Sequence, residues 1–181
     1  SIIAATVLAS SAFASDFAAV AGFRSNSADA VTTGVTMNSK SGIGAGVLGF
    51  FDLMGDLQGR MGFLYNQRNL SGKSGTTEFD LNLAYMDIPV TAMYKFADYA
   101  GMFVGPVVSL LASKEYKSNV SGGEPSSSPE GMNVGLQFGA SFKFAPQLGA
   151  ELYYETFPST IWKDAVKNVR TVGVNLLFTF E

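Results

Sequence analysis

The chain has 181 residues, of which 47% are hydrophobic and only 15% are charged, and its formal net charge is −3. It contains no run of about eighteen apolar residues, the length that a transmembrane helix requires. The charge offers no electrostatic footprint for nucleic acid, and the absence of cysteine and histidine removes disulfides, thiolate metal sites and histidine-based catalysis.

The amino end has the features of a targeting segment. Ile2 to Ala9 is a largely apolar run, and Ala12-Phe13-Ala14 has the small-x-small pattern of a signal cleavage site. We therefore expect residues 1–14 to be the remnant of a truncated signal peptide and the mature protein to begin near Ser15. An ordinary apolar strand or helix start is the alternative. A signal peptide implies export across an inner membrane.

Residues that alternate between apolar and polar predict β-strands in the first half of the chain. Strands are expected at 16–26, 43–52 and 57–68, with polar loops at 25–42 and 69–77. The pattern does not separate the two faces of the Gly-rich strand at 43–52. A longer strand at 78–96 changes phase near Ala84, so that either a bulge re-phases it or its amino half projects beyond the bilayer.

The second half continues the pattern. Strands are expected at 100–117, 131–145 and 148–157, and the loops at 118–130 and 158–168 are polar or flexible by composition. The last strand, 169–180, is continuously apolar on one face. The other face carries mostly small and polar residues. It is therefore the candidate for a closing strand that pairs with the first.

The predicted connections alternate between long polar loops and short turns, which is typical of outer-membrane barrels. The sequence thus predicts an all-β fold: a closed antiparallel up-and-down transmembrane β-barrel of about eight strands. One barrel domain would occupy residues 15–181, in a Gram-negative-type outer membrane, with both termini periplasmic. A soluble lipocalin-like barrel is the fold alternative, but it would require an apolar interior and a polar exterior.

Aromatic residues recur at the expected periplasmic ends of the strands. Such residues favour the membrane interface because their rings tolerate the boundary between lipid and water. We expect this belt to contact outer-membrane lipid and to comprise Phe17, Tyr94, Phe96, Phe142, Phe144, Phe178 and Phe180.

The opposite face of the strands carries both signs of charge. A barrel of about eight strands is only wide enough for its side chains to fill. We therefore expect the inward charges to form structural ion pairs, and these are Arg24, Arg60, Arg68, Asp87, Lys95, Glu115, Lys143, Glu151 and Glu155. A narrow channel or transport accessory lined by the same charges is the alternative. A lipid-modifying enzyme fits less well because histidine is missing.

One strand resembles a known family. The segment from Tyr85 to Phe96, with its Asp-Ile-Pro core, resembles the strand Tyr-Leu-Glu-Ile-Pro-Leu-x-x-Lys-Tyr of PorT-like outer-membrane barrels. Gly105-Pro106 and the segment from Val134 to Glu155 are similar to later strands of that family. The resemblance implies a small barrel with an OmpX-like or OmpA-like architecture, without implying one activity. The closing strand is similar to the signal that the outer-membrane assembly machinery reads.

Together these features predict a non-enzymatic outer-membrane barrel with a filled polar interior. Its role would be structural, or would depend on surface interaction through extracellular loops. We expect no cofactor, no metal and no nucleic acid partner. The sequence does not identify an extracellular partner.

Overall fold

The computed structural model describes residues 16–119, 128–162 and 166–180, with the backbone only for 159–162. Among these residues no helix is long and apolar enough to cross a membrane. The strands are β1 (Asp16–Ala30), β2 (Val35–Met54), β3 (Leu57–Ser74), β4 (Thr77–Ala97), β5 (Ala100–Ser118), β6 (Met132–Ala145), β7 (Leu148–Trp162) and β8 (Val166–Phe180).

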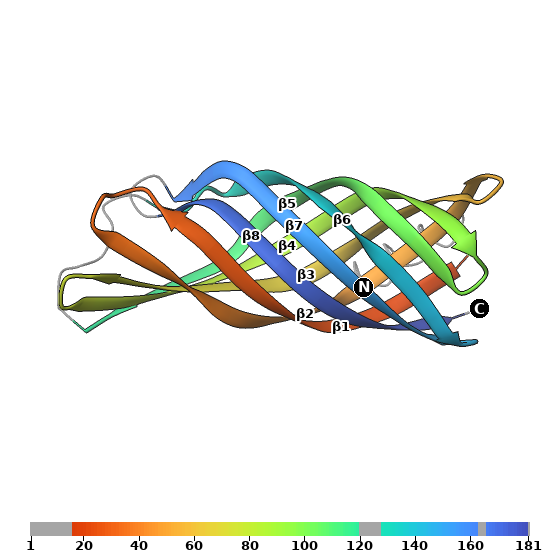
Figure 1. The fold of residues 1–181 in the computed structure, drawn as a ribbon, viewed down its shortest axis with the longest axis horizontal. Coiled ribbons are helices and arrows are strands. Elements are labelled where there is room, and N and C mark those ends of the chain that lie inside the picture. The colour runs from red at the N-terminus through yellow and green to blue at the C-terminus, as the bar shows by residue number, and fades with distance from the viewer. Residues whose placement is uncertain (1–15, 120–127, 163–165, 181) are drawn as a thin grey trace, which may run out of the picture.

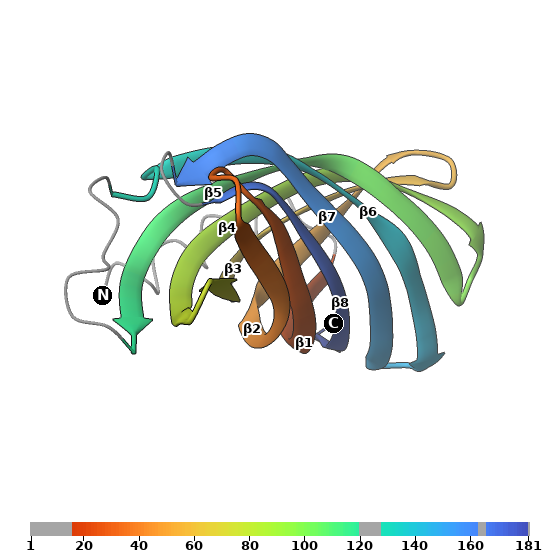
Figure 2. The same ribbon diagram turned by 60° about the vertical axis from the view of Figure 1, so that its left-hand side comes forward.

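The strands form a closed antiparallel barrel in sequence order, so the expected architecture is confirmed. β8 pairs with β1 from Phe17↔Phe180 to Ala30↔Val166 and closes the ring. Closure removes free sheet edges along these pairings. Figure 1 shows the strands winding obliquely around the long axis, and Figure 2 shows the barrel with the left-hand end of Figure 1 turned toward the viewer. We call the end where β1 begins and β8 ends the proximal end, and the other the distal end.

The distal connections are shorter than the sequence predicts. The expected loops at 25–42, 69–77 and 158–168 are wrong, because strand pairing continues through most of each. β3 and β4, for example, are joined by a tight turn in which Gly75 has a φ of 59°. Composition predicted loops because the side chains are polar, yet backbone pairing outside an apolar environment does not need apolar side chains. Most of the expected loop at 118–130, and residues 1–14, lie outside the described residues.

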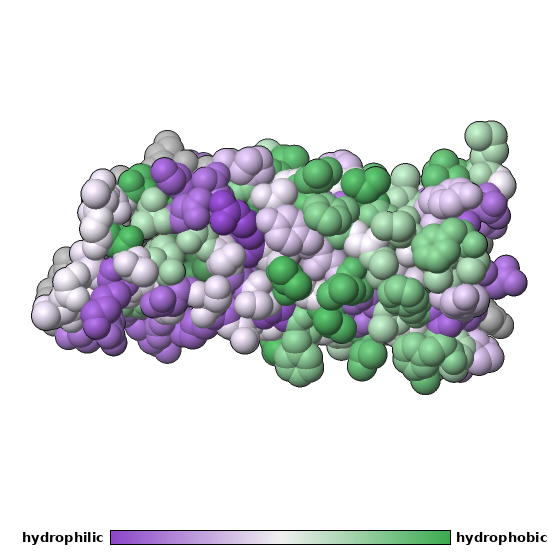
Figure 3. Space-filling model, in the orientation of Figure 1, coloured by the Kyte–Doolittle hydropathy of each residue, from purple (hydrophilic) through white to green (hydrophobic). Residues whose placement is uncertain are grey.

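The outer surface has two zones. Large apolar side chains are exposed around the proximal part, and the distal surface is mostly polar, as Figure 3 shows. The structure also separates the faces of β2: Ile43 and Val47 are exposed, whereas Leu48 and Phe50 are buried. Strands of up to 21 residues exceed the 9–11 or so that a tilted membrane strand requires. The distal zone is therefore an extension of the barrel beyond its apolar band.

β4 explains the change of apolar phase near Ala84. Its backbone keeps one alternation throughout, with Leu81, Leu83, Tyr85 and Asp87 all buried. No bulge re-phases β4. The apolar residues change faces because the barrel interior is apolar at the distal end, where the exterior is polar. The irregularity lies in the partner strand, where the register shifts between Leu111 and Ser113 of β5.

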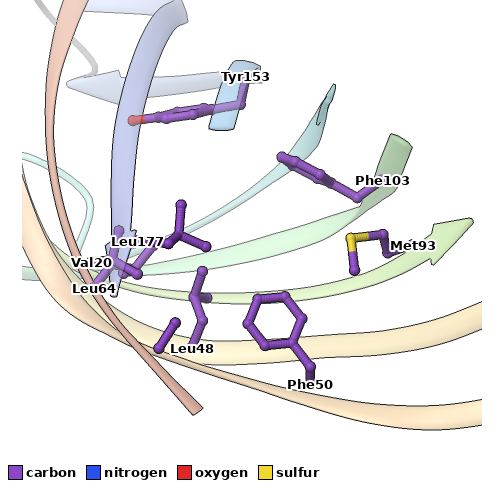
Figure 4. Close-up of a cluster of buried hydrophobic side chains, with 9 residues drawn as sticks. Val20, Leu48, Phe50, Leu64, Met93, Phe103, Tyr153 and Leu177 are labelled. Atoms are coloured by element: carbon purple, nitrogen blue, oxygen red, sulfur yellow. The ribbon is translucent and has the colours of Figure 1, made fainter. Parts of the chain in front are cut away.

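Two apolar clusters fill the interior near its two ends. The distal cluster consists of Leu70, Leu81, Leu83, Tyr85, Val107, Phe157, Val166 and Val169. The proximal cluster, shown in part in Figure 4, consists of Ala18, Val20, Leu48, Phe50, Leu64, Met93, Phe103, Tyr153 and Leu177. Buried charged side chains, including Arg60 and Arg68, lie between these clusters and contact rings of both.

Candidate functional site

The first element of the buried polar region is a pair between β3 and β7. Arg60 donates through Nε to Glu151 Oε1 at 3.0 Å and through Nη2 to Glu151 Oε2 at 2.7 Å. Both side chains are completely buried. Arg60 Nη1 also donates to Gln137 Oε1 at 3.0 Å. Paired N–H···O contacts of this kind fix the orientation of both groups as well as neutralising their charges.

The second element is centred on Asp87 of β4. Arg68 donates to its Oδ1 at 3.0 Å and to its Oδ2 at 2.7 Å. Asn66 and Ser109 each donate to the same carboxylate at 2.5 Å. Arg68 also reaches Glu155 Oε2 at 3.3 Å. Asp87 is therefore an acceptor for three side chains, two from β3 and one from β5.

Gln137 links the two elements. Its Oε1 accepts from Arg60, and its Nε2 donates to Glu155 Oε1 at 2.7 Å. Glu155 in turn contacts Arg68. We call the connected group of Arg60, Arg68, Asp87, Gln137, Glu151 and Glu155 the ion-pair layer.

Aromatic rings from both apolar clusters bracket the ion-pair layer. The guanidinium carbon of Arg60 lies 4.3 Å from the ring centre of Phe103, in the proximal cluster. That of Arg68 lies 4.4 Å from Phe157 and 5.0 Å from Tyr85, both in the distal cluster. A guanidinium above a ring face is attracted by the ring quadrupole, most strongly where water is excluded. The charges of the ion-pair layer thus lie between the proximal and the distal apolar cluster.

The other expected interior charges have different environments. Arg24 is buried but forms no ion pair among the described residues, and its guanidinium carbon lies 5.7 Å from the Tyr153 ring centre. Lys95 and Lys143 are at the proximal mouth, where they line a cavity of about 130 Å³. Lys95 is partly exposed and Lys143 exposed. Neither joins the ion-pair layer.

The expectation that Glu115 lines the interior is wrong. Glu115 is exposed on the distal extension, where it accepts a hydrogen bond from Asn82 at 3.2 Å and contacts Lys117 at 3.3 Å. The register shift between Leu111 and Ser113 adds one residue to β5, which reverses the faces beyond it. As a result Tyr116, and not Glu115, packs against the distal cluster.

The expected interface aromatics lie at the proximal ends of their strands. Phe17 is partly buried, and the exposed members are Tyr94, Phe96, Phe142, Phe144, Phe178 and Phe180. The rings of Phe178 and Phe180 meet edge to face, with their centres 5.0 Å apart. These residues border the apolar band at its proximal side, and their role as a membrane-interface belt stays a prediction.

Sequence reasoning missed the uncharged members of the interior. Asn66, Ser109 and Gln137 hold the carboxylates and arginines in place, and Asn175 donates to Glu151 at 3.4 Å. A usable signal was present, because each of these residues lies on the strand face opposite the exposed apolar set. Within the described part of the chain, no cluster of three or more acidic, histidine or cysteine side chains could hold a metal ion.

Comparison with known proteins gives a family match and a set of similar folds. The family model described as an outer membrane protein beta-barrel domain matches residues 13–156. No curated protein sequence matches the chain significantly. The structure of the Neisserial surface protein A is similar with a TM-score of 0.57 and 17% identity, covering 91% of this chain and 97% of that one.

A second similar structure is that of Ail, the attachment invasion locus protein of Yersinia pestis, in complex with the heparin analogue sucrose octasulfate. Its TM-score is 0.52 at 12% identity, and the match covers 91% of this chain and 98% of that one. At these identities the two likenesses describe the fold alone. Both structures are matched over nearly their whole length.

Proposed function

This chain belongs to the family of outer-membrane β-barrel domains, and from that premise we propose that it is a non-enzymatic barrel with a filled interior that acts at the cell surface. It resides in the outer membrane. Its role is structural, or consists of contacts made by the distal extension. The proximal end, where β1 begins and β8 ends, faces the periplasm, and β8 is the strand that the assembly machinery recognises.

The observation that carries this proposal is the order of the interior layers. The ion-pair layer spans the barrel between Arg60–Glu151 and Arg68–Asp87, with an apolar cluster on either side. A barrel of this size has room for side chains and little else. The proximal cavity that Lys95 and Lys143 line is also lined by Met93 and Leu177 of the proximal cluster. These features favour a plugged barrel over a channel.

The surface role is supported by the distal extension. Its outward charges form ion pairs, including Lys40–Asp80 at 3.0 Å and Lys73–Glu78 at 3.1 Å. A cavity of about 480 Å³ lies beside the turn between β3 and β4, and its lining includes Phe79 and Asn38. A strand-paired extension with a polar outer face is suited to contact water and soluble partners.

Within the family, we propose that the chain is related to the PorT-like barrels. The support is the Asp-Ile-Pro motif, whose Asp87 is the hydrogen-bonding centre of the interior. A glutamate stands at this position in the PorT-like motif. If the role is shared, Asp87→Glu should fold, whereas Asp87→Leu, which leaves Arg68 without its main partner, should not. Equal loss of folding in both variants would contradict the relationship.

The first test of the function is single-channel conductance of the purified barrel in planar bilayers. We expect no discrete steps from the wild-type protein. Reproducible steps whose ion selectivity changes in Lys95→Glu would overturn the filled-interior proposal and favour the channel.

The surface role needs a separate test. Deleting residues 72–79 leaves Ser71 and Asp80, a paired position, to form a shorter β3–β4 turn. We expect this variant to keep its heat-dependent gel mobility and to lose binding to extracellular-matrix proteins arrayed on a surface. Deletion of a proximal turn residue, Asp56, is the matched control and should leave binding unchanged. Equal binding by the wild type and the trimmed barrel would contradict the surface role.

A further inference from the structure

We propose that Arg24, together with Tyr153, holds a monovalent anion of halide size inside the barrel. The proposal goes beyond the filled-interior function, because it assigns a ligand to a part of the interior that the ion-pair layer does not use.

Arg24 differs from the other buried arginines in its contacts. Its side chain is 4% exposed, and its Nε and Nη1 have no hydrogen-bond partner among the described residues. Arg60 and Arg68, by contrast, each make two N–H···O contacts to one carboxylate. A buried guanidinium with free donors is a strong indication of a missing acceptor, because desolvation of the charge is otherwise uncompensated.

The arrangement of the carboxylates explains why Arg24 is left over. Among the described residues, three carboxylates are buried in the interior, but Arg68 contacts two of them, Asp87 and Glu155. The third, Glu151, is held by Arg60. The three buried arginines and three buried carboxylates of the described chain sum to zero charge. The carboxylates are nevertheless shared between Arg60 and Arg68, so none is left to contact Arg24.

Glycines shape the space around Arg24. A Cβ added at Gly44 would collide with Nη2 of Arg24 and with Oδ1 of Asn66, so the guanidinium lies directly over this glycine. Oδ1 of Asn66 is buried without a hydrogen-bond partner in the described chain, and it lies beside the same Cβ position as this nitrogen. This oxygen is placed to accept a hydrogen bond from Nη2 alone, so Nε and Nη1 of Arg24 remain as donors for a ligand.

Tyr153 supplies a second donor of the right kind. Its hydroxyl is buried with no hydrogen-bond partner among the described residues, and it lies over Gly173. Gly173 is the residue that pairs with Arg24 across β1 and β8. The Tyr153 ring thus approaches Arg24 from two strands away, at 5.7 Å from ring centre to guanidinium carbon.

The chemistry of these groups selects an anion. The free groups are guanidinium N–H donors and one phenol O–H, and an anion accepts from all of them without needing to donate. A single-atom anion requires few partners, whereas a polyatomic oxyanion would need more donors than this region offers. The positive charge of Arg24 supplies the electrostatic part of the affinity.

Crystals grown in sodium bromide test the proposal by anomalous scattering. We expect a bromide peak in contact with the Arg24 guanidinium in the wild-type barrel, and none at that position in Arg24→Met. Arg170→Met, which removes an arginine from an exposed surface pair, is the matched control and should keep the peak. Density at the site without anomalous signal would mean that water is the occupant and would overturn the proposal.

A second measurement keeps the test decisive if Arg24→Met does not fold. Tyr153→Phe removes one hydroxyl and leaves the cation in place. Unfolding midpoints in vesicles, measured in bromide against gluconate at equal ionic strength, should rise with bromide for the wild type. The bromide concentration that gives half of the stabilisation should be about tenfold higher in Tyr153→Phe, because the loss of one charge-assisted hydrogen bond weakens binding by about that factor. Equal midpoints in the two salts for the wild type would also overturn the proposal.

Discussion

Arg60 and Glu151 face each other across the barrel interior as a two-contact ion pair, at 3.0 Å and 2.7 Å, with both side chains fully buried. Removing one partner leaves the other charge in a site from which water is excluded. We therefore expect Arg60→Ala to lower the free energy of unfolding by about 3–5 kcal/mol, measured by urea titration in lipid vesicles. Arg170→Ala is the control: it breaks an exposed pair with Asp29 and should cost under about 1 kcal/mol. Similar losses in both variants would contradict a structural role for the buried pair.

Gly44 is predicted to be intolerant of a side chain. A Cβ there would meet Arg24 and Asn66, both of which are buried and cannot move into solvent. We expect Gly44→Ala to destabilise the barrel by about 1–3 kcal/mol. Gly59→Ala is the matched control, since the atoms nearest to its Cβ would belong to the ring of Phe51, which is partly exposed on the outer surface and free to swing away. Equal unfolding midpoints for the two variants would show that the interior is looser than the structure indicates.

An arginine introduced on the outer surface should lower the stability of the barrel more, the deeper its position lies in the bilayer. Leu152 is 54% exposed within the apolar band, and Phe144 is 63% exposed at its proximal border. In lipid vesicles, Leu152→Arg should lower stability by about 2–4 kcal/mol and Phe144→Arg by at most about 1 kcal/mol. Both costs should shrink in a short-chain detergent that adapts to the new charge. The reverse order of the two variants would place the membrane elsewhere on the barrel.

The orientation in the membrane is open to a labelling test, because the chain contains no cysteine. Thr33 and Thr76 lie in exposed distal turns, whereas Asp56 and Asp98 lie in exposed proximal turns. In intact cells, a membrane-impermeant maleimide should modify Thr33→Cys and Thr76→Cys. It should modify Asp56→Cys and Asp98→Cys only after the outer membrane is permeabilised. Labelling of the proximal pair in intact cells would invert the proposed orientation.

The distal extension also makes a pH-dependent prediction. The amide of Asn82, and then Lys117, lower the pKa of Glu115 below its ordinary value of 4.5. Because the folded pKa lies below the unfolded one, Glu115 contributes stability above pH 4.5 and loses it as the pH falls through the folded pKa. Asn82→Ala should move the pKa of Glu115 upward, which carboxyl-carbon NMR can follow. An unchanged titration would mean that Lys117 dominates.

Most of the barrel could be predicted from alternation, because lipid on one side and a packed interior on the other impose a period of two. β6 and β8 show this most clearly, with apolar residues such as Leu136 and Val174 exposed on one face. The distal ends were not predictable in this way. There the environments reverse, and polar composition was interpreted as loop although pairing continues to Ser74↔Thr77.

The interior site was predictable in part for the same reason. Asp87, Glu151 and Glu155 could be placed inside because they alternate along their strands with exposed apolar residues such as Met86 and Leu152. Glu115 was misplaced because an added residue in β5 cannot be seen in alternation alone. Which arginine meets which carboxylate depends on register across several strands, and the isolation of Arg24 follows from those pairings. No local pattern contains that information.

The two halves of β4 have consequences for how the protein is made. Leu81 and Met86 present apolar side chains on opposite faces of the same strand, one toward the distal interior and one toward the outside. Neither water nor lipid alone can satisfy such a strand. An unclosed sheet in the periplasm would expose the apolar side chains that face lipid in the finished barrel. A sheet inserted into the membrane before closure would expose to water the apolar side chains of the distal interior. Ring closure at one end and entry into lipid at the other must therefore advance together, and a chaperone has to shield the chain until they do.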